Sequence, residues 1–124
     1  MKLVLSALAC GIVLAAGSSG ASAQNSEPSY KADPAVYTVI FEDANFRVIR
    51  GVRKKGQKDN PHSHPVSSIV YNVNDCKNKL YAADGKSVLR DNKAGTASAV
   101  PITASHSTEN IGDSDCTQIF VEKK

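Results

Sequence analysis

Short apolar and β-branched runs, each bounded by turn residues, follow one another along the chain from residue 35 to the end. Apolar and polar positions alternate within several of these runs, and no stretch carries a helical period long enough to predict an amphipathic helix. The strands predicted from this pattern are residues 36–41, 46–52, 66–73, 79–83, 86–90, 96–100, 107–111 and 117–122. We therefore predict an all-β fold of about eight short antiparallel strands.

Turn residues between the runs indicate hairpin connections. Residues 42–45 form a connection of hairpin length, and Asp84-Gly85 is typical of a type I′ turn, in which both central residues have a positive φ. A sandwich or a barrel is favoured, because closing so small a sheet removes its exposed strand edges. We predict that this single domain spans residues 35–124.

The first 23 residues differ in composition from the rest. Lys2 precedes an apolar stretch over residues 3–16, and the small residues Ala-Ser-Ala follow at 21–23. This order is typical of a secretory signal peptide, and the apolar stretch is too short to span a bilayer as a stable helix. A lipid anchor on Cys10 is the alternative, which the continuing apolar run beyond that residue disfavours. We expect cleavage after residue 23 and export, with the bacterial periplasm as the compartment.

The next segment, residues 24–34, is polar and contains Pro28 and Pro34 without any apolar period. Such a composition predicts a flexible N-terminal arm in front of the folded domain.

The charge balance of the chain excludes some partners. Removal of residues 1–23 takes away one lysine and no acid, which leaves 14 basic and 12 acidic groups. A nearly neutral domain does not have the concentrated basic face of a protein that binds nucleic acid or an anionic membrane. One basic cluster exists, and we interpret it as a solvated strand end and loop. Its members are Arg50, Arg53, Lys54, Lys55 and Lys58.

Two cysteines remain after cleavage, Cys76 and Cys116, and both lie among turn residues. Export delivers them to an oxidising compartment, in which paired thiols are the expected state, so we predict a disulfide. A thiolate that ligates a metal or acts as a nucleophile is the alternative.

The three histidines of the chain occur in two places, His62-Ser63-His64 and His106. Alternate residues of a strand share one face, so His62 and His64 can both point inward, and a third imidazole from a neighbouring strand would complete a set of three nitrogen ligands. The competing interpretation is an exposed loop, because prolines flank the His-Ser-His segment on both sides.

The spacing around these histidines resembles the cupin superfamily. The first cupin motif is Gly, five residues, His-x-His, three or four residues, Glu, six residues, Gly. The second is Gly, five residues, Pro-x-Gly, two residues, His, three residues, Asn. Seven of the ten signature positions are kept here: Gly56, His62, His64, Gly95, Pro101, His106 and Asn110. Three positions depart from the motifs: Ser68, Asp75 and Thr103.

The resemblance implies a cupin-type jelly-roll barrel that holds one divalent transition metal, Fe, Mn, Zn, Cu or Ni, inside its mouth through the three histidines. Ser68 stands where many cupins have a metal-binding glutamate, which leaves the fourth ligand open. We interpret Asn110 as a partner of the ligands or a turn support. Tyr71 and Tyr81 are interpreted as barrel wall or core, with Tyr71 near the pocket.

These observations together predict an exported metal-binding cupin that acts on or binds a small molecule. Dioxygenase-like oxidation at a three-histidine centre is the leading enzymatic version, and its catalytic residues are unknown. The alternative is a non-catalytic module that binds a metal or a small ligand. We expect no nucleic acid partner and no stable membrane insertion, and a homodimer stays open.

Overall fold

The computed structural model describes residues 25–124. The predicted signal peptide, residues 1–23, lies outside the described residues. Within the described part of the chain, no helix is both long and apolar enough to cross a membrane.

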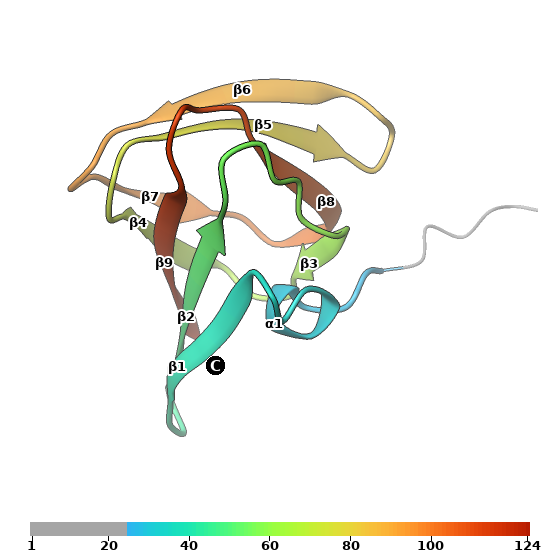
Figure 1. Ribbon diagram of the computed structural model, residues 1–124. Coiled ribbons are helices and arrows are strands. Elements are labelled where there is room, and N and C mark those ends of the chain that lie inside the picture. The colour runs from blue at the N-terminus through green and yellow to red at the C-terminus, as the bar shows by residue number, and fades with distance from the viewer. Residues whose placement is uncertain (1–24) are drawn as a thin grey trace, which may run out of the picture.

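The described residues form two antiparallel sheets that face each other around a common interior (Figure 1). The five-stranded sheet has the order β1-β2-β9-β4-β7, and the four-stranded sheet has the order β3-β8-β5-β6. The elements are α1 (Ser29–Ala32), β1 (Tyr37–Glu42), β2 (Phe46–Arg53), β3 (His62–His64), β4 (Ser68–Asn72), β5 (Cys76–Ala82), β6 (Ser87–Asn92), β7 (Ala97–Val100), β8 (Thr103–Asn110) and β9 (Cys116–Lys123). This architecture confirms the predicted all-β class and is consistent with a jelly-roll barrel.

All eight strands predicted from the sequence are present, and the structure adds β3. This strand is only three residues long and lies between prolines, so its sequence carries no strand period. The predicted type I′ turn is wrong: among residues 25–124 only glycines have a positive φ, so Gly85 (84°) has one and Asp84 does not. The Gly85 amide donates instead to the Ala82 carbonyl, which closes a turn that needs only one left-handed residue.

A small apolar core lies against the inner face of the five-stranded sheet. Its buried members are Val36, Tyr37, Ile49, Val70 and Phe120. The disulfide between Cys76 on β5 and Cys116 on β9 joins the two sheets and confirms the predicted pairing. Because it closes a separation of 40 residues, the chain-entropy model assigns it about 4 kcal/mol of stabilisation.

Residues 25–34, the described part of the predicted N-terminal arm, contact the barrel. The Ser63 amide donates to the Glu27 carbonyl at 2.9 Å, and the Asn60 amide donates to the buried Asp33 carboxylate at 3.0 Å. Helix α1 contacts β1 and β3. The segment is therefore packed against the edge of the barrel, through hydrogen bonds to residues 60 and 63 that no local sequence pattern reveals.

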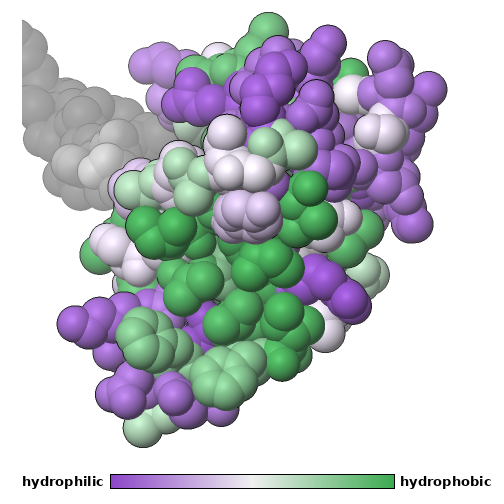
Figure 2. Space-filling model, turned by 90° about the vertical axis from the view of Figure 1, so that its left-hand side faces the viewer, coloured by the Kyte–Doolittle hydropathy of each residue, from purple (hydrophilic) through white to green (hydrophobic). Residues whose placement is uncertain are grey.

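Apolar side chains also lie in a row on the outer face of the five-stranded sheet. Strand pairing places Phe41 opposite Val48, Val48 opposite Val121, and Val121 opposite Ile69. Figure 2 shows hydrophobic residues gathered over this face, and Phe41 and Ile69 are each about half exposed. The homodimer left open by the sequence stays a prediction.

Candidate metal centre

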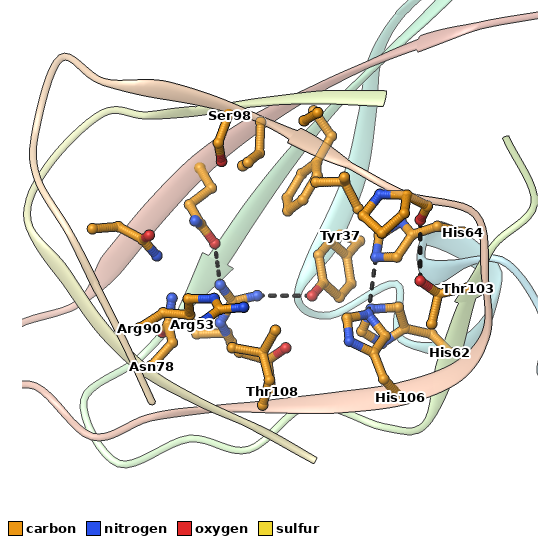
Figure 3. A pocket seen from close by; sticks show the side chains of 18 residues that line it. Tyr37, Arg53, His62, His64, Asn78, Arg90, Ser98, Thr103, His106 and Thr108 are labelled. Atoms are coloured by element: carbon orange, nitrogen blue, oxygen red, sulfur yellow. Dashed lines mark hydrogen bonds between the residues drawn. The ribbon is translucent and has the colours of Figure 1, made fainter. Parts of the chain in front are cut away.

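The three histidines come together because β3 and β8 are neighbours in the four-stranded sheet. His62 and His106 are direct cross-strand partners, and His64 lies opposite Thr103 after a register shift. One ring nitrogen from each of the three imidazoles lies within 4.8 Å of the others. The structure thus assembles the predicted group of His62, His64 and His106, and this group can hold one metal ion (Figure 3).

The tautomer of His62 is fixed by its backbone neighbour. Its Nδ1 lies 2.9 Å from the Asn60 carbonyl oxygen, which can only accept, so Nδ1 carries the hydrogen. The other ring nitrogen, Nε2, is buried and has no hydrogen-bond partner among the described residues. A buried lone pair without a partner costs free energy, and a bound divalent metal ion would remove that cost by accepting the lone pair.

The other two imidazoles also fit a shared metal ion. Nε2 of His64 lies 2.9 Å from Nε2 of His106. Two nitrogens that each lie 2.0–2.1 Å from one ion and subtend a right angle are about 3 Å apart, so this separation suits adjacent ligands. Three neutral imidazoles are ligands typical of Fe, Mn, Zn, Cu or Ni, and the residues present do not distinguish among them.

Burial keeps the histidines neutral at physiological pH. Desolvation, assisted by the neighbouring imidazoles, lowers the pKa of His64 to about 4 and that of His106 to about 3. Desolvation likewise lowers the pKa of His62, although the nearby Asp59 carboxylate opposes it. Since a metal binds the neutral form of imidazole, protons compete little with the metal at pH 7.

A buried polar network lies behind the histidines. Asp59 accepts a hydrogen bond from the Tyr37 hydroxyl at 2.6 Å and another from the Thr108 amide at 2.6 Å. Arg53 completes the network: its Nη1 lies 3.4 Å from the Asp59 carboxylate and donates to the Tyr37 hydroxyl at 2.7 Å. The same guanidinium also donates to the Gln118 side chain. Asp59 lies 3.7 Å from Nδ1 of His62, so the network fixes the chain immediately before the metal-binding strand.

Glycine is required at one position of this network. Tyr37 and Gly51 are cross-strand partners on β1 and β2. A Cβ atom on Gly51 would lie 2.9 Å from the Tyr37 ring and 3.2 Å from the Phe120 ring. The absence of a side chain at residue 51 thus lets the Tyr37 ring pack on the sheet with its hydroxyl directed toward Asp59.

The histidines lie at one end of a pocket inside the barrel, with a volume of about 260 Å³. Figure 3 shows them on one side, with Tyr37 in the middle and Arg53, Asn78 and Arg90 on the other side. Apolar side chains form the wall between the two ends: Val70, Leu80, Val100 and Phe120. The volume is below the roughly 300–1,000 Å³ that is typical of pockets for drug-sized ligands, so the pocket suits a small molecule.

The structure does not bring the other predicted site residues to the histidines. Ser68 is buried on the inner face of β4, but it is not among the residues that line the pocket. Tyr71 is 44% exposed, because alternation along β4 turns it to the outer face, and it does not line the pocket. Asn110 donates to the carbonyls of Arg53, Lys54 and Ser114, and it therefore supports the turns at the far end of β8.

Sequence reasoning missed the polar network of the barrel interior, in which Tyr37, Arg53 and Asp59 meet. The interpretation of Arg53 as part of a solvated cluster is wrong, because this residue is only 2% exposed. A signal was present: the alternation that places Ile49 inside also places Gly51 and Arg53 inside, and all three are buried. Asp59 carried no such signal, since it lies in a connection whose burial depends on contacts with other strands.

Comparisons with known proteins support the fold. No protein-family model matches the chain, and no curated protein matches it. Among solved structures, a cupin domain from Bordetella pertussis Tohama I matches with a TM-score of 0.66 and 20% identity, over 72% of this chain and 92% of its own. An RmlC-like cupin family protein with a double-stranded β-helix fold from Methanocaldococcus jannaschii matches with a TM-score of 0.58 and 15% identity, over 71% of this chain and 78% of its own.

A third solved structure, an RmlC-like cupin protein from Desulfovibrio desulfuricans, has a TM-score of 0.51 and 16% identity, over 73% of this chain and 86% of its own. Identities this low establish the fold and nothing finer. The resemblance read from the two histidine motifs is thereby confirmed at the level of architecture, and the chain has the cupin fold.

Proposed function

We propose that this chain is an exported metal-binding cupin that holds a small molecule in its barrel pocket next to a three-histidine metal centre. The observation that carries the proposal is the His62 imidazole. Its Nδ1 hydrogen is donated to the Asn60 carbonyl, while its buried Nε2 lone pair has no partner in the described part of the chain and lies close to the ring nitrogens of two other neutral imidazoles. A merely structural histidine would normally be satisfied at both nitrogens.

The enzymatic version of the proposal is a dioxygenase-like oxidation. A redox-active ion such as iron, held by three neutral nitrogens, would supply the chemistry toward dioxygen and leave coordination positions open to substrate. The residues of the chain would orient the imidazoles, through Asn60 and the rings of Tyr37 and Phe120. The apolar wall would position the substrate and exclude water.

The second candidate is a non-catalytic module that binds a metal or a small ligand, and one observation favours it. Among the residues described, no aspartate or glutamate lines the pocket. The Tyr37 hydroxyl is committed to Asp59 and Arg53, and burial strongly raises its pKa, so it is a poor proton donor or acceptor for a substrate. Among the described residues, the pocket therefore offers no free carboxylate or phenol as a general acid or base.

Export is proposed from the N-terminal sequence and is supported by the disulfide. Disulfides are typical of oxidising compartments, and Cys76 and Cys116 are both fully buried and bonded. Amino-terminal sequencing of the exported protein should begin at residue 24, and a retained first residue would contradict this part of the proposal.

The proposal is tested by metal analysis of protein purified without added metal. We expect about one transition-metal ion per chain, and we expect His62→Ala to abolish it. Protein reloaded with Fe²⁺ would then be screened for dioxygen consumption with small organic acids and thiols. Oxygen uptake that requires His62 supports the enzyme, whereas metal without uptake supports the binding module. Absence of metal before and after reloading contradicts the metal centre and the enzyme, and it leaves only a module that binds a small ligand without metal.

A further inference from the structure

The end of the pocket opposite the histidines carries an unbalanced positive charge. Two arginines, Arg53 and Arg90, line the pocket, and no acidic residue of the described chain does. Asp59 pairs with Arg53 from behind at 3.4 Å. Arg90 has no carboxylate within ion-pair distance among residues 25–124. Among the described residues, the guanidinium of Arg90 is therefore an unpaired positive charge at this end of the pocket.

Strand pairing places a second polar group beside this arginine. Asn78 on β5 is the direct cross-strand partner of Arg90 on β6, and both side chains line the pocket. Direct partners in an antiparallel pair have Cβ atoms about 4.5–5.5 Å apart, so the two side chains can contact one small group together. Asn78 is 2% exposed, while Arg90 lies on the exposed edge strand of its sheet.

Two buried polar atoms at this end have no hydrogen-bond partner within residues 25–124. Among these residues, none donates to Oδ1 of Asn78 and none accepts from Nε of Arg53. An unsatisfied buried acceptor and an unsatisfied buried donor each cost free energy, unless a ligand supplies the matching groups. A ligand that satisfies these groups would present an acceptor to Arg53, an anion to Arg90 and a donor to Asn78.

We propose that Arg90, Asn78 and Arg53 bind the carboxylate end of a short hydroxy or amino acid, whose remainder extends along the apolar wall toward the histidines. A carboxylate accepts from a guanidinium in a forked geometry, which makes arginine a suitable partner. The adjacent hydroxyl or ammonium group would donate to Oδ1 of Asn78. The inference deepens the proposed function, because it names the class of small molecule that the same pocket takes.

Nuclear magnetic resonance titration with three small probes tests the inference. Lactate carries both groups, lactamide has the same size without the charge, and propionate lacks the hydroxyl. The protein is first stripped of metal with a chelator and desalted, and ionic strength is kept constant. We expect lactate to shift the Asn78 side-chain amide and the Arg90 backbone amide in a saturable way, and to bind at least about tenfold more tightly than lactamide. Propionate should bind with an affinity between those of lactate and lactamide.

A matched pair of variants separates the site from general charge effects. Arg90→Gln removes the proposed anion contact, whereas Arg50→Gln removes an equal charge from an exposed position that does not line the pocket. We expect Arg90→Gln to weaken lactate binding at least about tenfold and Arg50→Gln to change it less than about twofold. Equal binding of lactate and lactamide, equal effects of the two variants, or no saturable shift would each overturn the inference.

The same samples distinguish this inference from the proposed metal site. The Arg90→Gln variant should bind metal with the same affinity as the wild-type protein, since Arg90 lies at the other end of the pocket from the histidines. Lactate binding without any metal binding would refute the metal site and keep the anion site. Metal binding without lactate binding would refute the anion site alone.

Discussion

Replacement of Asp59 by asparagine tests the buried network that holds the metal-binding strand. The carboxylate accepts hydrogen bonds of 2.6 Å from both the Tyr37 hydroxyl and the Thr108 amide, and it lies 3.4 Å from the Arg53 guanidinium. Both charged side chains are almost fully buried, with exposed fractions of 0% for Asp59 and 3% for Arg53. Asp59→Asn keeps the shape of the side chain and removes its charge, which leaves the guanidinium without its counter-charge inside the barrel.

The expected loss of stability follows from the burial of the Arg53–Asp59 ion pair. Removing one partner of a buried ion pair costs about 3–5 kcal/mol, because the remaining charge stays desolvated. We therefore expect Asp59→Asn to lower the free energy of unfolding by about 3–5 kcal/mol, whereas Asp91→Asn, at an exposed position, should change it by less than about 0.5 kcal/mol. Urea denaturation of the oxidised, metal-free protein measures both values.

A double-mutant cycle isolates the pair itself. Arg53→Met removes the guanidinium and retains a flexible side chain of similar length. Because Asp59→Asn is costly mainly when Arg53 remains charged, the double variant should be more stable than the sum of the single effects predicts, by at least about 1 kcal/mol. Strictly additive effects, or a cost of Asp59→Asn no larger than that of Asp91→Asn, would show that the buried ion pair does not hold the network together.

Three further perturbations have expected outcomes. Gly51→Ala should lower both stability and metal affinity, because its Cβ would lie 2.9 Å from an aromatic ring of the network; unchanged denaturation and metal titration curves would count against it. In metal-free protein, stability should fall as the pH drops from about 6.5 toward 4, by about 1.4 kcal/mol per unit for each of His64 and His106. The folded pKa values of these residues, about 4 and about 3, lie below the 6.5 of the unfolded chain, so only the unfolded state takes up protons there; urea midpoints that stay constant between pH 7 and 5 would argue otherwise. Replacing Cys76 and Cys116 together by serine should cost about 4 kcal/mol in unfolding free energy, and a loss below about 1 kcal/mol would show that the link between the sheets matters little.

The strands and the histidine group could be predicted because each rests on local information. Alternation and turn residues identified eight strands, and the spacing around His62, His64 and His106 identified the residues that the structure brings within 4.8 Å. Once the histidine motifs are matched to a fold, that fold predicts where the motif residues lie in space. The predicted pairing of Cys76 with Cys116 rested on the redox compartment and was likewise confirmed.

The polar interior could not be predicted in the same way. Alternation along β2 does turn Arg53 inward, but its partners Tyr37, Asp59 and Gln118 lie on other strands or connections, and only the tertiary structure brings them together. Tyr71 was misplaced for a different reason. Alternation along β4 puts Ser68, Val70 and Asn72 inside, so its outward direction was available from the pattern.

Calorimetric titration with Ni²⁺ tests the metal centre most directly, with metal-free protein and its His106→Ala variant at pH 7. We expect one site per chain in the wild-type protein, and an affinity at least about 100-fold lower in the variant, since loss of a ligand should cost more than the 10–100-fold typical of outer partners. Near-ultraviolet circular dichroism of the variant would confirm that the barrel stays folded. Equal affinities in the two proteins would contradict the assignment of His62, His64 and His106 as a metal centre.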